Sequence, residues 1–180
     1  MRKLFMAALL IVCAAPFTFA QTATSGDYNK YDIYAGFSHD RVDIDGREGF
    51  NGVEGAITGN LSRYFGLKGD YSFHRKSFNG ETVDLHTLVG GVEIKDNAPE
   101  TKIKPFAHAL AGFTHARVSV DGITGLDDTQ TGFAAVLGGG LDFRVSPRVD
   151  FRAIQFDYNP THFGGDTQHN FRIGVGIIFR

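Results

Sequence analysis

The sequence contains very little cysteine and lacks tryptophan. Its 180 residues include a single cysteine, Cys13, and no tryptophan. One cysteine excludes an intramolecular disulfide, so packing and backbone hydrogen bonds must hold the fold. Lipid attachment at Cys13 is disfavoured because Val12 stands where a small residue is needed. The net charge of −2 gives no reason to expect a nucleic-acid partner. After residue 20, no stretch is long and apolar enough for a transmembrane helix.

The N-terminus has the pattern of an export signal. Arg2 is part of a basic start, the stretch Leu4–Ala15 is apolar, and the small residue Ala20 precedes a polar run. A short apolar stretch between a basic start and a small residue is typical of a secretory signal peptide. The sequence therefore predicts a cleaved signal peptide over residues 1–20 and one domain over residues 21–180.

The last ten residues, FRIGVGIIFR, alternate strictly between two kinds of side chain. Successive side chains of a strand point to opposite faces, so this segment has one apolar face and one polar or small face. The polar face contains Arg172 and Arg180, with Ile178 as its apolar exception. The apolar face consists of Phe171, Ile173, Val175, Ile177 and Phe179. A strand with one oily face that closes an exported chain indicates a β-barrel in an outer membrane.

The same period of two divides the rest of the chain into about eight strands. The alternation is clearest in Phe65–His74 and least clear in Val83–Lys95 and Lys102–Val118. The other predicted strands are Tyr31–His39, Val53–Ser62, Gly132–Ser146, Val149–Asn159 and Asn170–Phe179. Short connections alternate with the long polar segments 40–52, 75–82, 119–131 and 160–169. Short turns at one end and longer loops at the other are typical of outer-membrane barrels.

The predicted fold is therefore an all-β, eight-stranded, antiparallel, up-and-down transmembrane β-barrel with short periplasmic turns and longer extracellular loops. A closed barrel is required because an open sheet would leave backbone groups unpaired in lipid. Two alternatives remain at this point: a barrel of ten strands, and a soluble lipocalin-like barrel whose interior, instead of its exterior, would be apolar. The register of the fourth, fifth and seventh strands is not defined by the pattern.

Residues 28–180 resemble the small eight-stranded outer-membrane barrels of the OmpA/OmpX type. The resemblance is carried by the first strand YDIYAGFSH, by the segment GGGLDFRVSPRVDFRAIQFDY and by the last strand. It implies location in a bacterial outer membrane, contact with outer-membrane lipid or lipopolysaccharide, and insertion by the barrel-assembly machinery. In this family, that machinery reads a C-terminal strand ending in an aromatic residue. Here Phe179 is penultimate and Arg180 is last. The resemblance implies that the apolar face of the last strand is the assembly signal.

The charged residues on the inner face of the predicted barrel are mixed in sign. They are Glu54, Lys68, Asp70, Asp142, Arg144, Asp150, Arg152 and Arg172. An eight-stranded barrel is just wide enough for side chains to fill its interior, and an unpaired charge there is costly. We therefore expect these residues to form ion pairs that plug the lumen. The alternative is a narrow, porin-like pore for ions or small solutes.

Other chemistry finds little support in the sequence. Ser38, His39 and Asp40 are the residue types of a hydrolase, but neighbours on a strand point to opposite faces. We therefore expect no enzymatic activity and no cofactor. His162 and His169 form the best candidate pair for a metal, but their spacing does not indicate a site. The acidic loops lack the spacing of an EF-hand. The expected role is structural, in envelope integrity, combined with binding of an unknown extracellular ligand by the loops.

Overall fold

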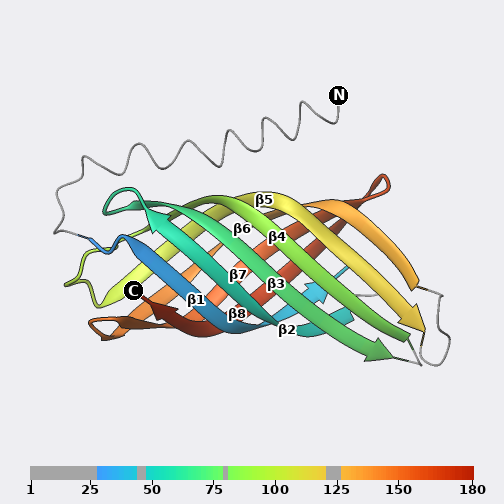
Figure 1. The fold of residues 1–180 in the computed structure, drawn as a ribbon, viewed down its shortest axis with the longest axis horizontal. Coiled ribbons are helices and arrows are strands. Elements are labelled where there is room, and N and C mark those ends of the chain that lie inside the picture. The colour runs from blue at the N-terminus through green and yellow to red at the C-terminus, as the bar shows by residue number, and fades with distance from the viewer. Residues whose placement is uncertain (1–27, 44–47, 79–80, 121–126) are drawn as a thin grey trace.

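In the computed structural model, the chain forms a closed barrel of eight antiparallel strands (Figure 1). The structure describes residues 28–180 except 44–47, 79–80 and 121–126. The strands are β1 (Tyr31–Val42), β2 (Glu48–Asn60), β3 (Phe65–Phe78), β4 (Glu81–Lys95), β5 (Ile103–Val120), β6 (Asp127–Ser146), β7 (Val149–Phe163) and β8 (Asp166–Phe179). The predicted signal peptide, residues 1–20, lies outside the described residues. Over the ranges that the structure describes, no helix could cross a membrane.

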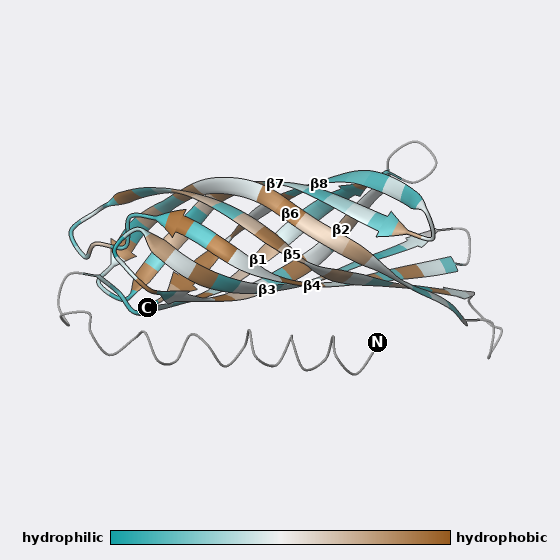
Figure 2. Cartoon of the chain, turned by 90° about the horizontal axis from the view of Figure 1, so that it is seen from above, coloured by the Kyte–Doolittle hydropathy of each residue, from teal (hydrophilic) through white to brown (hydrophobic). Residues whose placement is uncertain are grey.

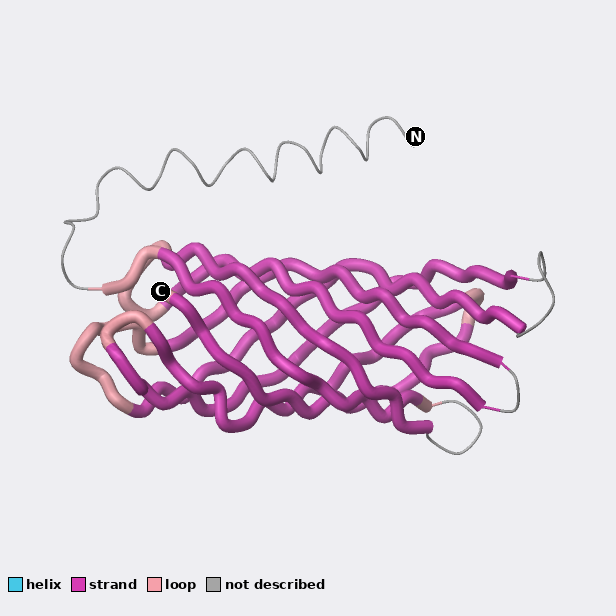
Figure 3. The backbone as a smooth tube through the Cα atoms, turned by 60° about the horizontal axis from the view of Figure 1, so that its bottom comes forward, coloured by secondary structure: helices cyan, strands magenta, loops and turns pink. Residues whose placement is uncertain are grey.

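Each strand pairs with its neighbours in sequence, and β1 pairs with β8 to close the barrel. In the closing ladder, Ile33 lies opposite Phe179 and Arg41 lies opposite Phe171. The strands are inclined to the barrel axis (Figure 3), as closure of a sheet requires. The predicted up-and-down topology is confirmed, and the strand number is eight, so the alternative of ten strands is wrong.

The two faces of the barrel differ sharply in polarity. Large apolar side chains such as Ile57, Phe113 and Ile173 are exposed on the outside, whereas Asp70, Lys104 and Arg172 are buried inside. Hydrophobic and hydrophilic residues follow one another along the strands (Figure 2), as expected when one face meets lipid and the other the lumen. A soluble barrel would have the opposite arrangement, so the lipocalin-like alternative is wrong. The exterior is instead matched to the hydrocarbon of a membrane.

The strands are longer at their outer ends than the sequence predicts. Much of 40–52, 75–82, 119–131 and 160–169, which we expected to be loop, continues the strands. For example, β7 and β8 stay paired up to Phe163 and Asp166, and only Gly164 and Gly165 form the turn. Beyond the lipid both faces of a strand are wet, so the alternation of polarity that marks a strand disappears although its hydrogen bonds continue.

A bulge in β7 changes which residues face inward. Arg152 lies opposite Gly176 of β8, whereas Gln155 lies opposite Gly174, so β7 contains one extra residue between them. Ala153 and Ile154 are both exposed, whereas Arg152 and Gln155 are buried. Inward positions have even numbers before the bulge and odd numbers after it. This change explains why the register of this strand could not be predicted from a simple alternation.

Candidate functional site: the charged lumen

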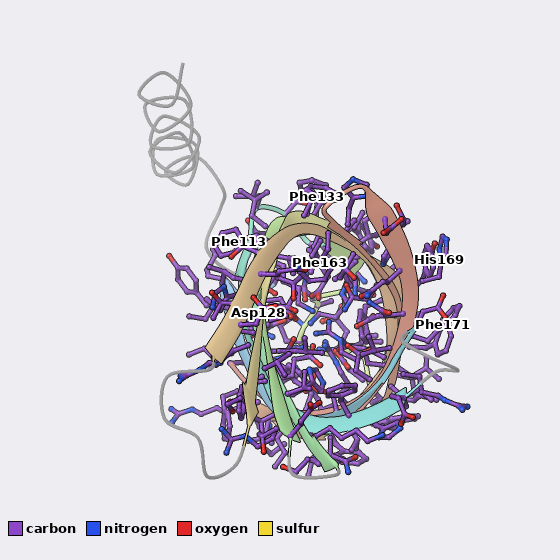
Figure 4. All side chains as sticks on the ribbon, turned by 90° about the vertical axis from the view of Figure 1, so that its right-hand side faces the viewer. Phe113, Asp128, Phe133, Phe163, His169 and Phe171 are labelled. Carbon is purple, nitrogen blue, oxygen red and sulfur yellow. The ribbon has the colours of Figure 1, made fainter. Side chains whose placement is uncertain are left out.

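All eight charged residues of the predicted network lie on the inner face of the barrel. Seven of them are at most 3% exposed, and only Arg144, near the periplasmic end, is partly accessible. The view down the barrel shows side chains crowding its interior (Figure 4). Phe113, Phe133 and Phe171 point away from it (Figure 4). The lumen is therefore the place where polar and charged groups of different strands can meet.

The centre of the lumen is organised around Arg172 of β8. Its guanidinium lies 2.8 Å from Asp157 on β7, 3.4 Å from Asp70 on β3 and 3.5 Å from Glu54 on β2. The side chain of Arg172 is fully buried. One cation thus joins carboxylates from three other strands, across the interior of the barrel.

His108 of β5 connects Lys68 to Asp157. Lys68 Nζ lies 3.1 Å from Nδ1 of His108, and Asp157 Oδ1 lies 2.9 Å from Nε2. A lysine ammonium can only donate, so Nδ1 accepts and Nε2 carries the proton that it donates to Asp157. The geometry therefore fixes one neutral tautomer of His108. The contact links β3, β5 and β7 through one imidazole.

Gln155 joins the Arg172 cluster to a second cluster around Arg152. Its amide nitrogen donates to Glu54 and Asp157, both at 2.7 Å, and its oxygen accepts from Arg152 at 2.6 Å. Arg152 also donates two hydrogen bonds to Asp142, at 2.8 and 3.1 Å. Its guanidinium stacks over the ring of Phe106, 3.9 Å from the centroid. Amide, carboxylates and guanidinium groups thus form one continuous network.

Towards the periplasmic end, the network continues through two further groups of charges. Lys95 donates to Asp32 at 2.6 Å and lies 3.3 Å from Glu93 and 3.5 Å from Asp142. At the mouth itself, Asp150 is approached by three cations. They are Lys104 at 3.4 Å, Arg144 at 3.8 Å and Arg180 at 2.6 Å.

Apolar clusters fill part of the lumen beside buried polar groups such as Asp40 and Ser38. Phe50 packs with Val42 and Leu85, all nearly fully buried, and Val83 and Ala116 pack against them. A second inward cluster joins Val89, Leu110, Ala134 and Val136. These side chains fill one part of the interior with hydrocarbon, which neither pairs with ions nor hydrates them.

Sequence reasoning missed about half of the network. The missed members are Asp32, Glu93, Lys95, Lys104, His108, Gln155, Asp157 and Arg180. Gln155 and Asp157 follow the bulge, which places them on the face opposite to the one the period predicts. On β5 the outward residues Ala107, Ala109 and Ala111 are small and the inward Leu110 is apolar, so polarity does not identify the inner face. Arg180 follows the last strand, and the alternation places it on the same face as Arg172 without indicating a partner.

The structure places Ser38 and the histidines in positions that match neither a hydrolase site nor a metal site. His39 is hydrogen-bonded to Asn51, whereas Ser38 lies inside, 2.8 Å from His74 of β3. His162 and His169 lie on the paired ends of β7 and β8, not in a loop, and contact Thr167 and Tyr158. Among the described residues, no three histidine, aspartate or glutamate side chains gather into a group that could hold a metal ion.

The residues of the expected assembly signal lie on the outer face of β8. Ile173, Val175, Ile177 and Phe179 are exposed, and Phe171 is half-buried against Tyr158 and Phe156. This strand closes the barrel by pairing with β1, and Ile178 packs inside against Tyr34 and Ala56. The apolar face is thus continuous from Phe171 to Phe179.

The periplasmic turns contain one strong ion pair outside the membrane-spanning strands. Arg63, between β2 and β3, donates two hydrogen bonds to Asp96, between β4 and β5, at 2.9 and 3.0 Å. Asp96 also accepts from the backbone of Ala98 and from the hydroxyl of Thr101. The hydrogen bond from Arg63, together with these donors, lowers the pKa of Asp96 to about 2. This contact ties two turns together at the periplasmic rim.

An apolar outer wall around a closed, charge-filled interior defines a transmembrane β-barrel. The chain belongs to the family described as "Outer membrane protein beta-barrel domain", whose model matches residues 5–179. This family places the protein in a bacterial outer membrane. Among curated protein sequences, none matches the chain significantly.

Solved structures of other small barrels share this fold. The chain is similar to Neisserial surface protein A, with a TM-score of 0.67 and 15% identity over 86% of this chain and 99% of that one. It is similar to Ail, the attachment invasion locus protein of Yersinia pestis, with a TM-score of 0.56 and 18% identity over 83% and 97%. The N-terminal barrel of Pseudomonas aeruginosa OprF has a TM-score of 0.52 and 16% identity over 84% and 99%. Identities this low establish a common fold.

Proposed function

We propose that the protein is a closed, non-conducting barrel that supports the outer membrane and presents its outer hairpins to an extracellular ligand. The observation that carries the first part is the position of Arg172. Its fully buried guanidinium contacts carboxylates on β2, β3 and β7, so it occupies the middle of the lumen. An ion crossing the barrel would have to displace a charge held by several partners at once.

The apolar cluster at the outer end supports the same conclusion. Phe50, Val42 and Leu85 pack against one another where a solute would enter from outside. Hydrocarbon side chains in this part of the lumen oppose ion passage because they offer no group to replace the ion's water. The lumen therefore combines a charged network with an apolar cluster, and both oppose conduction. A narrow porin-like pore is the second candidate function.

The outer hairpins supply the surface for an interaction. The strands continue past the apolar band, and there they expose polar side chains such as Arg41, Asp128 and Asp166. Ail, a barrel of the same fold, has been solved in complex with the heparin analogue sucrose octasulfate. That complex is an example of a small barrel binding an external ligand, which supports a binding role for the hairpins of this chain.

The proposal also covers export, membrane assembly and lipid contact. Residues 1–20 act as a cleaved export signal, residues 21–180 form the barrel domain, and the outer face of β8 is read by the barrel-assembly machinery. The barrel wall contacts outer-membrane lipid or lipopolysaccharide. The role is not enzymatic, because Ser38 meets His74 inside the lumen and no carboxylate of the described residues is hydrogen-bonded to that histidine.

Bilayer conductance of refolded residues 21–180 tests the closed lumen. A shift between boiled and unboiled samples on a gel first establishes that the barrel has formed. We expect the folded protein to be electrically silent, whereas discrete channel steps would favour the pore.

The variant Arg152→Ala distinguishes a plug from a gate. Its removal leaves Asp142 without a bidentate partner, so we expect lower stability with no current. Full stability together with a new current would mean that the network is a gate.

A further inference from the structure

The charges of the lumen are segregated along the barrel axis. In the middle, carboxylates outnumber cations, since Glu54, Asp70 and Asp157 face Lys68 and Arg172. At the periplasmic mouth the balance is reversed. Three cations, Lys104, Arg144 and Arg180, approach the single carboxylate of Asp150.

The second carboxylate near this mouth does not correct the excess. Asp32 lies 3.4 Å from Arg180, but it also accepts a hydrogen bond from Lys95 at 2.6 Å. Lys95 has two further carboxylates beside it, Glu93 and Asp142. Asp32 therefore serves two cations, and the group of Lys104, Arg144 and Arg180 retains more positive than negative charge.

The donor atoms of these cations are also underused. Their nitrogens lie at ion-pair distance from Asp150 and Asp32 but make no well-aligned hydrogen bond to a described residue. They are Lys104 Nζ, Nε and Nη2 of Arg144 and all three guanidinium nitrogens of Arg180. The carboxylate oxygens beside them, both of Asp150 and Oδ1 of Asp32, also lack a hydrogen bond. The side chain of Lys104 is fully buried and that of Arg180 is 1% exposed. Three cations thus share the few oxygens of Asp150 and Asp32, and an additional acceptor beside these buried donors would be favoured.

We propose that the periplasmic mouth of the lumen binds a small inorganic anion, held by Lys104, Arg180 and Arg144. The anion would balance the excess charge and accept hydrogen bonds from donors that Asp150 does not satisfy. The site must be small, because the side chains of Lys104, Arg180 and Asp150 are almost fully buried. The inference does not depend on the closed lumen, since a conducting barrel would hold the same cluster.

The test uses chloride as the probe and the protein purified from outer membranes in detergent micelles. Chloride replaces gluconate, which is too bulky for the site, at constant ionic strength, and the unfolding midpoint is followed by heat-dependent gel mobility. A ligand that binds only the folded barrel raises this midpoint in a saturable manner. We expect such a rise for the unaltered protein and for the control Lys102→Gln, whose side chain is exposed next to the same strand.

The variant Lys104→Met keeps the length of the side chain and removes its charge. We expect its midpoint to be independent of chloride and, in gluconate, at least as high as that of the unaltered protein, since the excess charge is smaller. Two results would overturn the proposal: an unfolding midpoint of the unaltered protein that does not change with chloride, or an equal rise in Lys104→Met. Either would indicate that water satisfies these donors.

Arg144→Gln provides a second variant if Lys104→Met does not fold. Arg144 lies at the edge of the mouth and is the most accessible of the three cations. Its loss should raise the chloride concentration for half of the stabilisation severalfold. A titration curve that coincides with that of the unaltered protein would also contradict the site.

Discussion

Arg172 and Asp157 are held side by side in the β7–β8 ladder, where Nε and Nη2 of the arginine both donate to one oxygen, Oδ2, at 3.0 and 2.8 Å. The other oxygen of Asp157 accepts from His108. Asp157 is thus shared between a guanidinium and an imidazole. Losing the guanidinium changes the charge balance of the whole central cluster, because the imidazole of His108 is neutral.

Replacing Arg172 by glutamine should therefore destabilise the barrel strongly. The change leaves Glu54, Asp70 and Asp157 facing one another with only Lys68 beside them. Removing one partner of a buried ion pair costs about 3–5 kcal/mol. Urea unfolding of the refolded barrel, followed by gel mobility, measures the loss.

Arg148→Gln is the matched control, because Arg148 is exposed in the β6–β7 turn. A surface change of this kind should stay within about 0.5 kcal/mol. Adding Asp157→Asn to Arg172→Gln should restore part of the stability. A loss below about 1 kcal/mol for Arg172→Gln alone would show that the carboxylates find other partners.

The Arg63–Asp96 pair predicts a defined acid sensitivity. The hydrogen bond from Arg63 lowers the pKa of Asp96 to about 2 in the folded barrel, against about 3.9 for an unperturbed aspartate. Because the folded-state value is the lower one, the contribution is fully present above pH ~4 and is lost as the pH falls through about 2. The melting midpoint of the unaltered protein should therefore fall more steeply between these values than that of Asp96→Asn.

The effect should be small, since both side chains are partly exposed and solvent screens the pair. Glu100→Gln is a suitable control, because Glu100 is exposed and lies 3.8 Å from Arg63 without a hydrogen bond. Parallel pH curves for the unaltered protein and Asp96→Asn would mean that this carboxylate is not held in its charged form by the turn.

Two glycines of neighbouring strands should respond oppositely to alanine. A Cβ at Gly91 would clash with the backbone oxygen of Ala109 on the paired strand, so the ladder would have to move. Gly91→Ala should cost about 1–3 kcal/mol or prevent folding. At Gly69 nothing lies within 4 Å of a Cβ, and Gly69→Ala should be neutral or stabilise by about 0.4–1 kcal/mol. The heat-shifted fraction after refolding compares them, and equal behaviour would be inconsistent with the described β4–β5 ladder.

The assembly role of β8 can be separated from its contribution to stability. Phe179→Ala removes an exposed aromatic residue at the end of the last strand, and Phe143→Ala removes one at the same end of β6. Both should refold in detergent. We expect only Phe179→Ala to lower the amount of barrel in outer membranes severalfold, measured by immunoblot of the membrane fraction. Equal levels of the two variants would remove the special role of the last strand.

The strands could be predicted where the outer wall is rich in large apolar residues and the inner wall is charged. This holds for β3, where Leu67 and Tyr71 face out and Lys68 and Asp70 face in. It fails on β4, where the inward Val89 is apolar and the outward Gly90 has no side chain. There the two faces differ in the size of their side chains and not in polarity, so the alternation of hydrophobic and polar residues does not reveal the strand.

About half of the members of the charged network could be predicted as inward residues, but their partners could not. Glu54 and Arg172 lie on inward positions that the alternation indicates, yet their contact depends on how far β8 is shifted relative to β2. That shift is set by closure of the whole barrel, a property of eight strands together. Sequence periodicity is local and contains no information about it.

One extra residue in the bulge of β7 determines which side chains of this strand face the lumen and which face lipid. Arg152 before it and Asp157 after it both reach the lumen only because β7 contains one extra position between Arg152 and Gln155. Shortening the chain by one residue there, for instance at Ala153, would rotate one half of the strand, sending either Asp150 and Arg152 or Gln155 and Asp157 towards lipid. Substitutions at Ala153 should be tolerated, whereas its deletion should not. The count of residues in this strand is therefore under stronger constraint than their identity.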